Sequence, residues 1–267
     1  MGLTDITKIP VIMRAKGWSK GADLLENWFS RAAYTRKTGG PMANELSSAY
    51  NIGDLNAWLL KKAEGKQVWD KIFNDQLWRS NDSSRGDAVK RLGTLLTAEG
   101  ILKEGIKDQP FGFKSYTAVD YERNKKALNA SSFKTGITTE LNETVAALGS
   151  FNLKLALNGK VSHTPGYVWK NNYTVKPESI DVWLWDLFDF EDGPNDLTSQ
   201  PLGCWDESDN SVAKIAITGG KVCVNNSTFR DYRIKNNLGG DFYICSDVLR
   251  HKFTQAVNLE PFEISSQ

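Results

Sequence analysis

The residues best suited to acid–base chemistry lie in one acidic, tryptophan-rich stretch, Asp181–Asp209, which holds nine Asp or Glu residues and no Lys or Arg. Its first part, 180–190, has the composition of a strand, and alternate residues of a strand point to opposite faces. One face is apolar except for Asp186, and Asp189 lies near the strand exit on the other face. A carboxyl group on an apolar face must be paired, hydrogen-bonded or protonated. We therefore expect Asp186 and Asp189 to act as acid/base or metal-holding groups; the structural alternative is that Asp186 accepts backbone hydrogen bonds or pairs with an arginine.

Cationic partners for these carboxylates occur nearer the C-terminus. Arg230 and Arg233 precede a Gly239-Gly240 turn, and a guanidinium group binds a carboxylate through two parallel hydrogen bonds. The same two arginines are suited to holding a phosphate. His163 is the remaining candidate, in a predicted turn before a strand, with an ordinary exposed histidine as the alternative. The predicted catalytic set is therefore Asp186, Asp189, His163, Arg230 and Arg233.

The end of the acidic stretch has the ligand types of a divalent-cation site. Asp189, Glu191, Asp192 and Asp196 surround a Gly193-Pro194 turn, and carboxylate oxygens suit Mg²⁺ or Ca²⁺. The spacing is not that of an EF-hand, so a solvated acidic loop is the alternative. The sequence requires no cofactor.

Composition and charge exclude several classes of protein. The chain has 267 residues, 40% of them hydrophobic, and a net charge of +1, which is typical of a packed globular protein with no general attraction to nucleic acid. No run is apolar enough for a transmembrane segment, and no signal peptide precedes the first elements. We expect a chain made in the cytoplasm that is secreted, if at all, by a signal-independent route. Cys204, Cys223 and Cys245 are expected to be small core residues, with one bridged pair if the compartment is oxidising.

The periodicity of the sequence divides it into a helical portion (1–106), a connection with a short helix (107–150) and a β-rich portion (151–267). The first 160 residues carry 24 basic and 17 acidic residues, and the rest carry 9 and 15. Apolar spacing predicts helices at Ser19–Tyr34, from Asp54 to a cap at Gly65, around Val68–Phe73, from Ser83 or Ser84 to about Gly100, and before Gly149. Residues 107–132 show no clear pattern, and we interpret them as an irregular connection or a weak strand pair.

From Phe151 the apolar residues alternate with a period of two, which predicts strands. We expect them at 151–158, with a hairpin turn at Asn158-Gly159, and at Tyr167–Val175, Ile180–Phe190, Ala213–Thr218, Lys221–Val224 and Asp241–Ser246. The predicted fold is α+β, with a helical N-terminal portion followed by a mostly antiparallel sheet or small barrel.

An ordered set of short strings resembles an uncharacterised bacterial family whose members are encoded near type VI secretion spike components. The strings are Ile9-Pro10 to Gly17-Trp18, Leu25 to Trp28-Phe29, Ala147-Leu148-Gly149 with Phe151, Asp186 to Phe190, Gln200 to Gly203 with Trp205, and Phe229-Arg230 with Gly239 to Phe242 and Ser246-Asp247. The resemblance implies an antibacterial effector that is fired into a neighbouring cell, with a spike or adaptor protein and a cognate immunity protein as partners.

A second, local resemblance concerns the reaction. Asp186-x-Phe188-Asp189 is similar to the Asp-x-Tyr-Asp core of colicin M-type enzymes, which cleave the lipid-linked peptidoglycan precursor. It implies that Asp186 and Asp189 are essential carboxylates. Phe188 replaces the tyrosine, and Asn195-Asp196 stand where a histidine-arginine pair is expected, so His163 or Arg230 would have to substitute.

Together these features predict a toxin that hydrolyses peptidoglycan or its precursor in the target cell envelope. The alternative is a non-enzymatic binding or adaptor protein, in which the basic helical and acidic β-rich portions serve docking.

Overall fold

The chain forms two compact units, each built from separate stretches of sequence. The computed structural model describes residues 5–36, 40–79, 88–113, 115–136, 139–165, 170–192, 199–206, 208–213, 222–255, 257, 259 and 262–265. Unit 1 consists of Met1–Ile52, Lys134–Phe151 and Asp186–Ile244, and unit 2 of Gly53–Phe133, Asn152–Trp185 and Cys245–Gln267. Each unit therefore combines residues from the N-terminal and the C-terminal parts of the chain.

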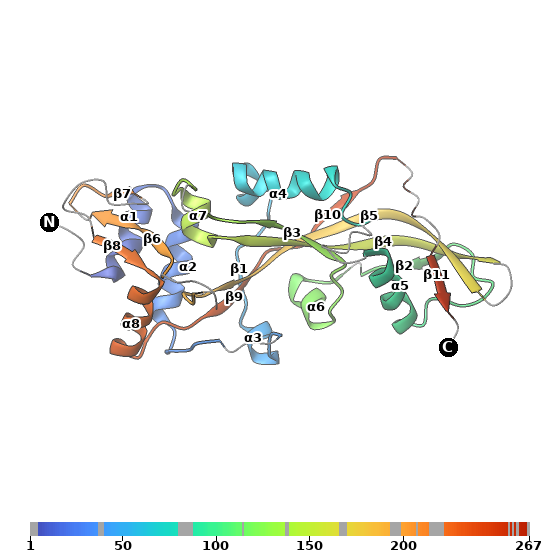
Figure 1. The fold of residues 1–267 in the computed structure, drawn as a ribbon, viewed down its shortest axis with the longest axis horizontal. Coiled ribbons are helices and arrows are strands. Elements are labelled where there is room, and N and C mark those ends of the chain that lie inside the picture. The colour runs from blue at the N-terminus through green and yellow to red at the C-terminus, as the bar shows by residue number, and fades with distance from the viewer. Residues whose placement is uncertain are drawn as a thin grey trace. The chain divides into compact units, whose positions relative to one another are not determined.

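Unit 1 packs helices against a small antiparallel sheet. Its helices are η1 (Ile6–Lys8), α1 (Ile9–Ala15), α2 (Ser19–Ser30), α3 (Ala43–Ser47), α7 (Glu143–Leu148) and α8 (Asn226–Asn236), and its strands are β1 (Tyr50–Asn51), β6 (Pro201–Asp206), β7 (Ser211–Ala213), β8 (Val222–Asn225) and most of β9 (Phe242–Cys245). The sheet has the order β7-β6-β8, and β1 pairs with β9. Helix α2 contacts α1 and α7, α8 contacts β8, and α1 contacts β6 (Figure 1).

Unit 2 is built on two long antiparallel strands. They are β4 (Phe151–Pro165) and β5 (Lys170–Phe188), and the other elements are η2 (Leu59–Lys61), α4 (Ala63–Asn74), α5 (Ala88–Ala98), β2 (Gln109–Phe111), α6 (Ala118–Arg123), β3 (Asn129–Phe133), β10 (Leu249–Lys252) and β11 (Phe262–Ser265). β2 and β3 pair with β4, and β10 and β11 pair with β5 (Figure 1). The α+β prediction with a helical N-terminal part is confirmed, and no helix among the described residues combines the length and apolarity needed to cross a bilayer.

Four helix predictions agree with the structure in position, because their apolar spacing is helical. The helix predicted around Val68–Phe73 is part of α4. α2 begins at Ser19 and buries Leu25 and Trp28, but it ends at Ser30 and not near Tyr34. α5 is followed by Gly100 with φ of +65°, and α7 ends at Gly149 with φ of +58°, a backbone conformation that glycine adopts without strain. The predicted start of α5, Ser83 or Ser84, lies outside the described residues.

Two predictions for the helical portion are wrong. The helix expected from Asp54 is a series of turns and η2, because the Asp54 carboxylate accepts the Asn56 N–H (2.8 Å) and holds the chain in a turn. Gly65 does not end a helix but lies in the first turn of α4, where a Cβ atom would collide with the Leu59 carbonyl group. The residues read as irregular, 107–132, contain β2, α6 and most of β3.

The hairpin turn expected at Asn158-Gly159 is also wrong, because β4 continues through it as a bulge. The Asn158 side chain accepts the Phe113 N–H (2.8 Å) and donates to Ser179 (3.4 Å). Gly159 lies against the backbone of Lys176, where there is no room for a Cβ atom. Here the two turn-forming residue types mark a close backbone approach inside a strand. The strands predicted at 167–175 and 180–190 correspond to one strand, β5, which ends at Phe188; residues 167–169 lie outside the described residues.

A disulfide bridge joins two strands of the unit 1 sheet. Cys204 of β6 and Cys223 of β8 are direct partners in the antiparallel register and are bridged, and Cys245 is free and buried. Burial raises the pKa of the Cys245 thiol to about 11, so this thiol stays protonated. The pairing is the arrangement expected for an oxidising compartment.

The deepest charged group of unit 2 is Asp181 in β5, whose side chain has no exposed surface. Arg250 of β10 donates to both carboxylate oxygens at 2.6 Å, and the Tyr121 hydroxyl donates to one of them at 2.5 Å. Burial and the neighbouring carboxylate raise the pKa of Tyr121, which keeps this donor protonated. The Tyr121 ring stacks on Trp183 at 4.3 Å, so a satisfied ion pair forms part of an aromatic core.

Replacing Arg250 with methionine should destabilise unit 2 by about 3–5 kcal/mol, because Asp181 is left charged and buried without a cation. Urea unfolding followed by tryptophan fluorescence measures this loss. The matched control is Lys160→Ala, which breaks an exposed pair between β4 and Glu178 of β5 and should cost less than about 1 kcal/mol. Equal losses in the two variants would contradict a special role for the buried pair.

Replacing Cys204 and Cys223 together with serine should lower the stability of unit 1 by about 3 kcal/mol. The bridge closes a loop with a sequence separation of 19, and such a cross-link stabilises mainly by restricting the unfolded chain. Thermal unfolding with and without a reducing agent measures the effect, and the double variant should no longer respond to the reductant. Cys245→Ser is the control and should retain the response.

Candidate functional site

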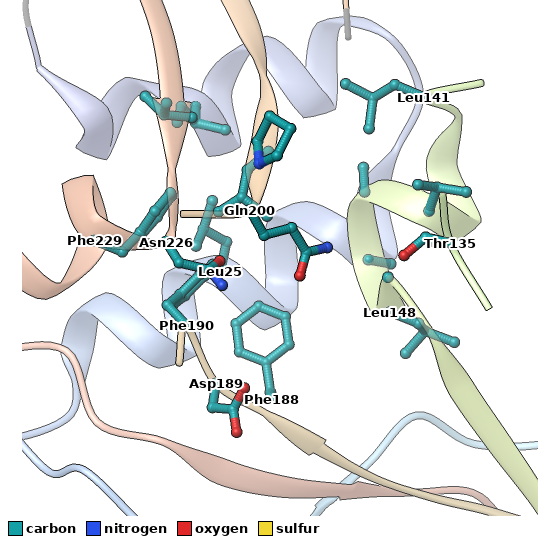
Figure 2. Close-up of a pocket in the computed structure, with 18 of the residues that line it drawn as sticks. Leu25, Thr135, Leu141, Leu148, Phe188, Asp189, Phe190, Gln200, Asn226 and Phe229 are labelled. Atoms are coloured by element: carbon teal, nitrogen blue, oxygen red, sulfur yellow. The ribbon is translucent and has the colours of Figure 1, made fainter. Parts of the chain in front are cut away.

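Unit 1 contains a cavity of about 240 Å³ that is lined mainly by apolar residues, while polar and apolar atoms contribute about equally to its surface. It is surrounded by α1, α2, α7, the end of β5, β6, β8 and the start of α8 (Figure 2). The lining residues with polar side chains are Thr135, Ser150, Asp189, Glu191, Gln200 and Asn226, together with the indole of Trp205. Apolar walls with a few convergent polar groups are typical of sites for small molecules.

The end of β5 and the residues directly after it form a continuous part of the cavity wall. β5 stops at Phe188, and the chain from Leu187 to Glu191 lines the cavity without interruption. Phe190 stacks on Phe229 of α8 with ring centroids 3.9 Å apart, and the edge of Trp28 approaches Phe190 at 4.8 Å. This aromatic packing holds the residue that directly follows Asp189.

The cavity contains side chains that can form hydrogen bonds, and the main chain of one of them, Gln200, is fixed by hydrogen bonds of its own. Gln200 receives Asn226 N–H at its carbonyl group (3.1 Å) and donates its own N–H to Asp192 (3.0 Å). Its side-chain amide has no hydrogen bond to another described residue and extends into the space between Phe188 and Thr135 (Figure 2). The Thr135 hydroxyl lies 3.0 Å from the Ser150 hydroxyl. An amide and a pair of hydroxyls are therefore placed to bind a polar group of a ligand.

Asp189 is a half-buried carboxyl group with no ion pair among the described residues. It lies beside Phe188 (Figure 2) and accepts a backbone hydrogen bond from Glu191. Burial, with the nearby charges of Asp241 and Glu191, raises its pKa to about 6, although Arg233 acts in the opposite direction. A carboxyl group with a pKa near neutrality can both release and accept a proton under physiological conditions.

Arg233 is a structural cation that holds this region together. It donates from Nε to the Gly239 carbonyl group (2.7 Å) and from one Nη to Glu191 (3.0 Å), and it also pairs with Asp241. Asp241 in turn accepts the Trp28 indole N–H at 3.3 Å. Burial is the largest effect on Asp241 and raises its pKa overall, although a backbone hydrogen bond and Arg233 act to lower it. The guanidinium group therefore supports the cavity and does not line it.

Arg230 binds the segment 190–192, which follows β5. It donates to the Phe190 carbonyl group (2.8 Å) and pairs with Asp192 (2.7 Å). Asp192 also accepts from Asn226 (2.9 Å). Burial acts to raise the pKa of Asp192, but these bonds, together with the Gln200 N–H, lower it overall. Both predicted arginines bind acidic residues that follow Asp189 in the chain: Arg230 pairs with Asp192, and Arg233 pairs with Glu191.

The remaining predicted site residues, Asp186 and His163, are not among the residues that line the cavity. Asp186 is half-buried and does not line it. The fully buried carboxylate of this strand is Asp181, which pairs with Arg250, and not Asp186, because β5 is covered on both faces from Ile180 to Trp185. His163 belongs to unit 2 and lies within β4 rather than in a turn; the Gly105 N–H donates to its Nδ1 at 3.2 Å.

Several residues of the site escaped the sequence analysis. Gln200, Thr135 and Asn226 are polar residues of ordinary type in segments without a catalytic pattern. The signal that was available is the Asn225-x-x-Thr228 capping box that begins α8, because it places Asn226 at a helix start. Among the described residues there is no group of three or more potential metal ligands, and Asp196 lies outside them.

Asp189→Asn should make unit 1 more stable at pH 7–8, by on the order of 1–3 kcal/mol. The folded protein favours the protonated carboxyl, with a pKa of about 6 against an ordinary 3.8. Wild-type stability is therefore lost as the pH rises through this interval, whereas asparagine is neutral throughout. Urea unfolding at pH 4, 6 and 8 measures the difference between the two proteins, which should vanish at the lowest pH.

Asp192→Asn is the contrasting variant, because the pKa of Asp192 is lowered in the fold. It should destabilise the protein at neutral pH, and the loss should shrink as the pH falls. The same sign of change in both variants would show that the environment of Asp189 is not as described.

A comparison with protein-family profiles places most of the chain in one family. The profile of the family described as "Family of unknown function (DUF6402)" matches residues 4–218 and 209–260. No curated protein and no solved structure matches the chain. Because the profile covers most of its length, the chain belongs to the DUF6402 family, a family of unknown function.

Proposed function

We propose that unit 1 is a hydrolytic enzyme domain in which Asp189 transfers a proton to or from a substrate group held in the cavity. The observation that carries the proposal is a half-buried carboxyl group, without an ion pair among the described residues, at the wall of an apolar cavity. A structural carboxylate would gain from a cation at hydrogen-bonding distance, and Arg233 donates to the neighbouring Glu191 instead.

The size of the cavity indicates what the substrate presents to it. About 240 Å³ is somewhat below the roughly 300–1,000 Å³ of sites that enclose drug-sized ligands. We infer that a ring-sized or short-chain part of a larger substrate enters it. Phe188 and Phe190 would contact its apolar part, and the Gln200 amide and the Thr135 hydroxyl would bind a carbonyl or hydroxyl group.

The biological setting that we propose is that of an antibacterial effector acting on peptidoglycan or its lipid-linked precursor in a target cell envelope. Its support is the ordered set of strings described for the sequence, which resembles effectors encoded beside secretion spike components. The Cys204–Cys223 bridge also supports it, because disulfides persist in the periplasm and are rare in the cytosol.

A non-enzymatic binding protein is the second candidate, and a specific observation favours it. Arg230 and Arg233, the cations expected to stabilise a reacting anion, are both engaged by carboxylates and carbonyl groups of the fold. As a binding protein, the chain would hold an apolar side chain of a partner protein in the cavity. Asp189 would then form a hydrogen bond to the partner and would transfer no proton.

The decisive experiment expresses the protein in a sensitive bacterium, with and without an export signal, as wild type, Asp189→Asn and Asp186→Asn. We expect lysis on export of the wild type, and at least a hundredfold loss of killing with Asp189→Asn, because proton transfer contributes factors of about 10²–10⁴. Asp186→Asn is the matched control, since Asp186 does not line the cavity, and should retain killing.

Purified wild-type and variant proteins should then be incubated with peptidoglycan and with its lipid-linked precursor, and the products identified by mass spectrometry. The rate should change its pH dependence near pH 6, where Asp189 titrates. Killing by the Asp189→Asn protein at the wild-type level would remove the enzymatic proposal and leave the binding protein. Absence of killing by the wild type in either compartment would remove the effector setting.

A further inference from the structure

A second cavity of unit 1, of about 200 Å³, lies between the end of α2, α3 and the segment around β9. Its lining residues are Arg31, Ala32, Tyr34, Asn44, Glu45, Ser48, Gly240, Asp241, Phe242 and Tyr243. It shares no lining residue with the cavity that contains Asp189. Its chemistry can therefore be considered separately.

Arg31 is the cation of this cavity, and it has no carboxylate partner among the described residues. Its guanidinium group lies over the Phe242 ring, 4.3 Å from the centroid, a favourable cation–π geometry. One Nη donates to the Ser48 carbonyl group at 3.3 Å. Nε is buried without an acceptor, and the other Nη makes no hydrogen bond to a described residue. Burial lowers the pKa of Arg31, as expected for a charge that the fold does not compensate.

The two carboxylates that line the cavity are already engaged by other groups. Glu45 accepts the Tyr34 hydroxyl (2.8 Å) and the Met42 N–H (2.7 Å), and it lies 3.7 Å from Arg36. Asp241 pairs with Arg233 and accepts the Arg36 N–H at 3.0 Å. Each of these carboxylates therefore has another arginine as its ion-pair partner, and Arg31 forms no ion pair with a described residue.

We propose that this cavity is a binding site for a small carboxylate, held by the Arg31 guanidinium group against the Phe242 ring. The two Nη atoms form a planar fork that matches the two oxygens of a carboxylate. A doubly charged phosphate fits less well, because one cation would face it with Glu45 and Asp241 close by. The rings of Phe242 and Tyr243 suit the flat or apolar remainder of such a molecule.

This proposal does not depend on the reaction proposed for Asp189. It rests on an uncompensated guanidinium group at a second cavity, and it remains testable if the protein proves not to be an enzyme.

The test titrates the full-length protein with benzoate by isothermal calorimetry and follows the thermal midpoint in parallel. We expect saturable binding to one site and a rise in the midpoint, since a ligand that binds the folded state stabilises it. Benzamide has the same shape without the charge and should bind at least tenfold more weakly. This comparison uses the wild-type protein alone, so it holds even if variants at Arg31 fold poorly.

Arg31→Gln should weaken benzoate binding at least tenfold. Arg14→Gln removes an exposed arginine that pairs with Asp23 and Glu26 in the same unit and should leave benzoate binding unchanged. Inorganic phosphate serves as the competing anion and should displace benzoate poorly. Equal binding of benzoate and benzamide, displacement by phosphate at equal concentration, or no binding at millimolar benzoate would each overturn the proposal.

Discussion

The buried guanidinium group of Arg233 is the interaction on which the organisation of unit 1 depends. It projects from α8 and bonds to Gly239, Asp241 and Glu191, segments that the chain reaches before and after the helix. Burying a guanidinium group is costly unless its N–H donors find acceptors. The positions of Gly239, Asp241 and Glu191 are therefore fixed relative to one another by the same side chain. Trp28, which donates to Asp241 and packs on Phe190, connects the same group to α2. Arg233 and Trp28 thereby position Glu191 and Phe190, which line the cavity.

The same arrangement explains why Asp189 differs from its acidic neighbours. Glu191 and Asp192 each receive an arginine, at 3.0 Å and 2.7 Å, whereas Asp189 shares its surroundings with two other carboxylates, Glu191 and Asp241. Its charged form is disfavoured by burial and by like charge together. Of the three carboxyl groups between residues 189 and 192, two bind arginines, and the third, Asp189, has a pKa near neutrality.

The sequence predicts the fold class and those elements whose apolar period and end signals agree, such as α7 before Gly149. It fails where a tertiary contact decides a local conformation. Asn158-Gly159 has the composition of a turn, but a side-chain bond to Phe113 and a close backbone approach make it a bulge. The burial of Asp181 escaped for a related reason, because strand alternation cannot reveal that both faces of a strand are covered.

The candidate site is predictable only in part, and for physical reasons. Acidic composition identifies the stretch that contains Asp189, and the arginines that hold its surroundings can be named from charge complementarity. Which of the carboxylates stays without a cation depends on distances between segments far apart in the sequence. Gln200 and Thr135 become functional candidates through their position beside a cavity, a property that residue type does not encode.

The interleaving of the two units constrains how the chain can fold. Unit 1 requires residues up to Ile244, and unit 2 requires β10 and the Arg250 that neutralises Asp181. Unit 1 cannot complete its core before residue 244 is synthesised, and unit 2 cannot neutralise Asp181 before Arg250 is synthesised. Such long-range closure is slow compared with local helix formation. Both cores therefore stay unfinished while the segments between these distant residues are synthesised, which extends the time in which chaperones can bind them.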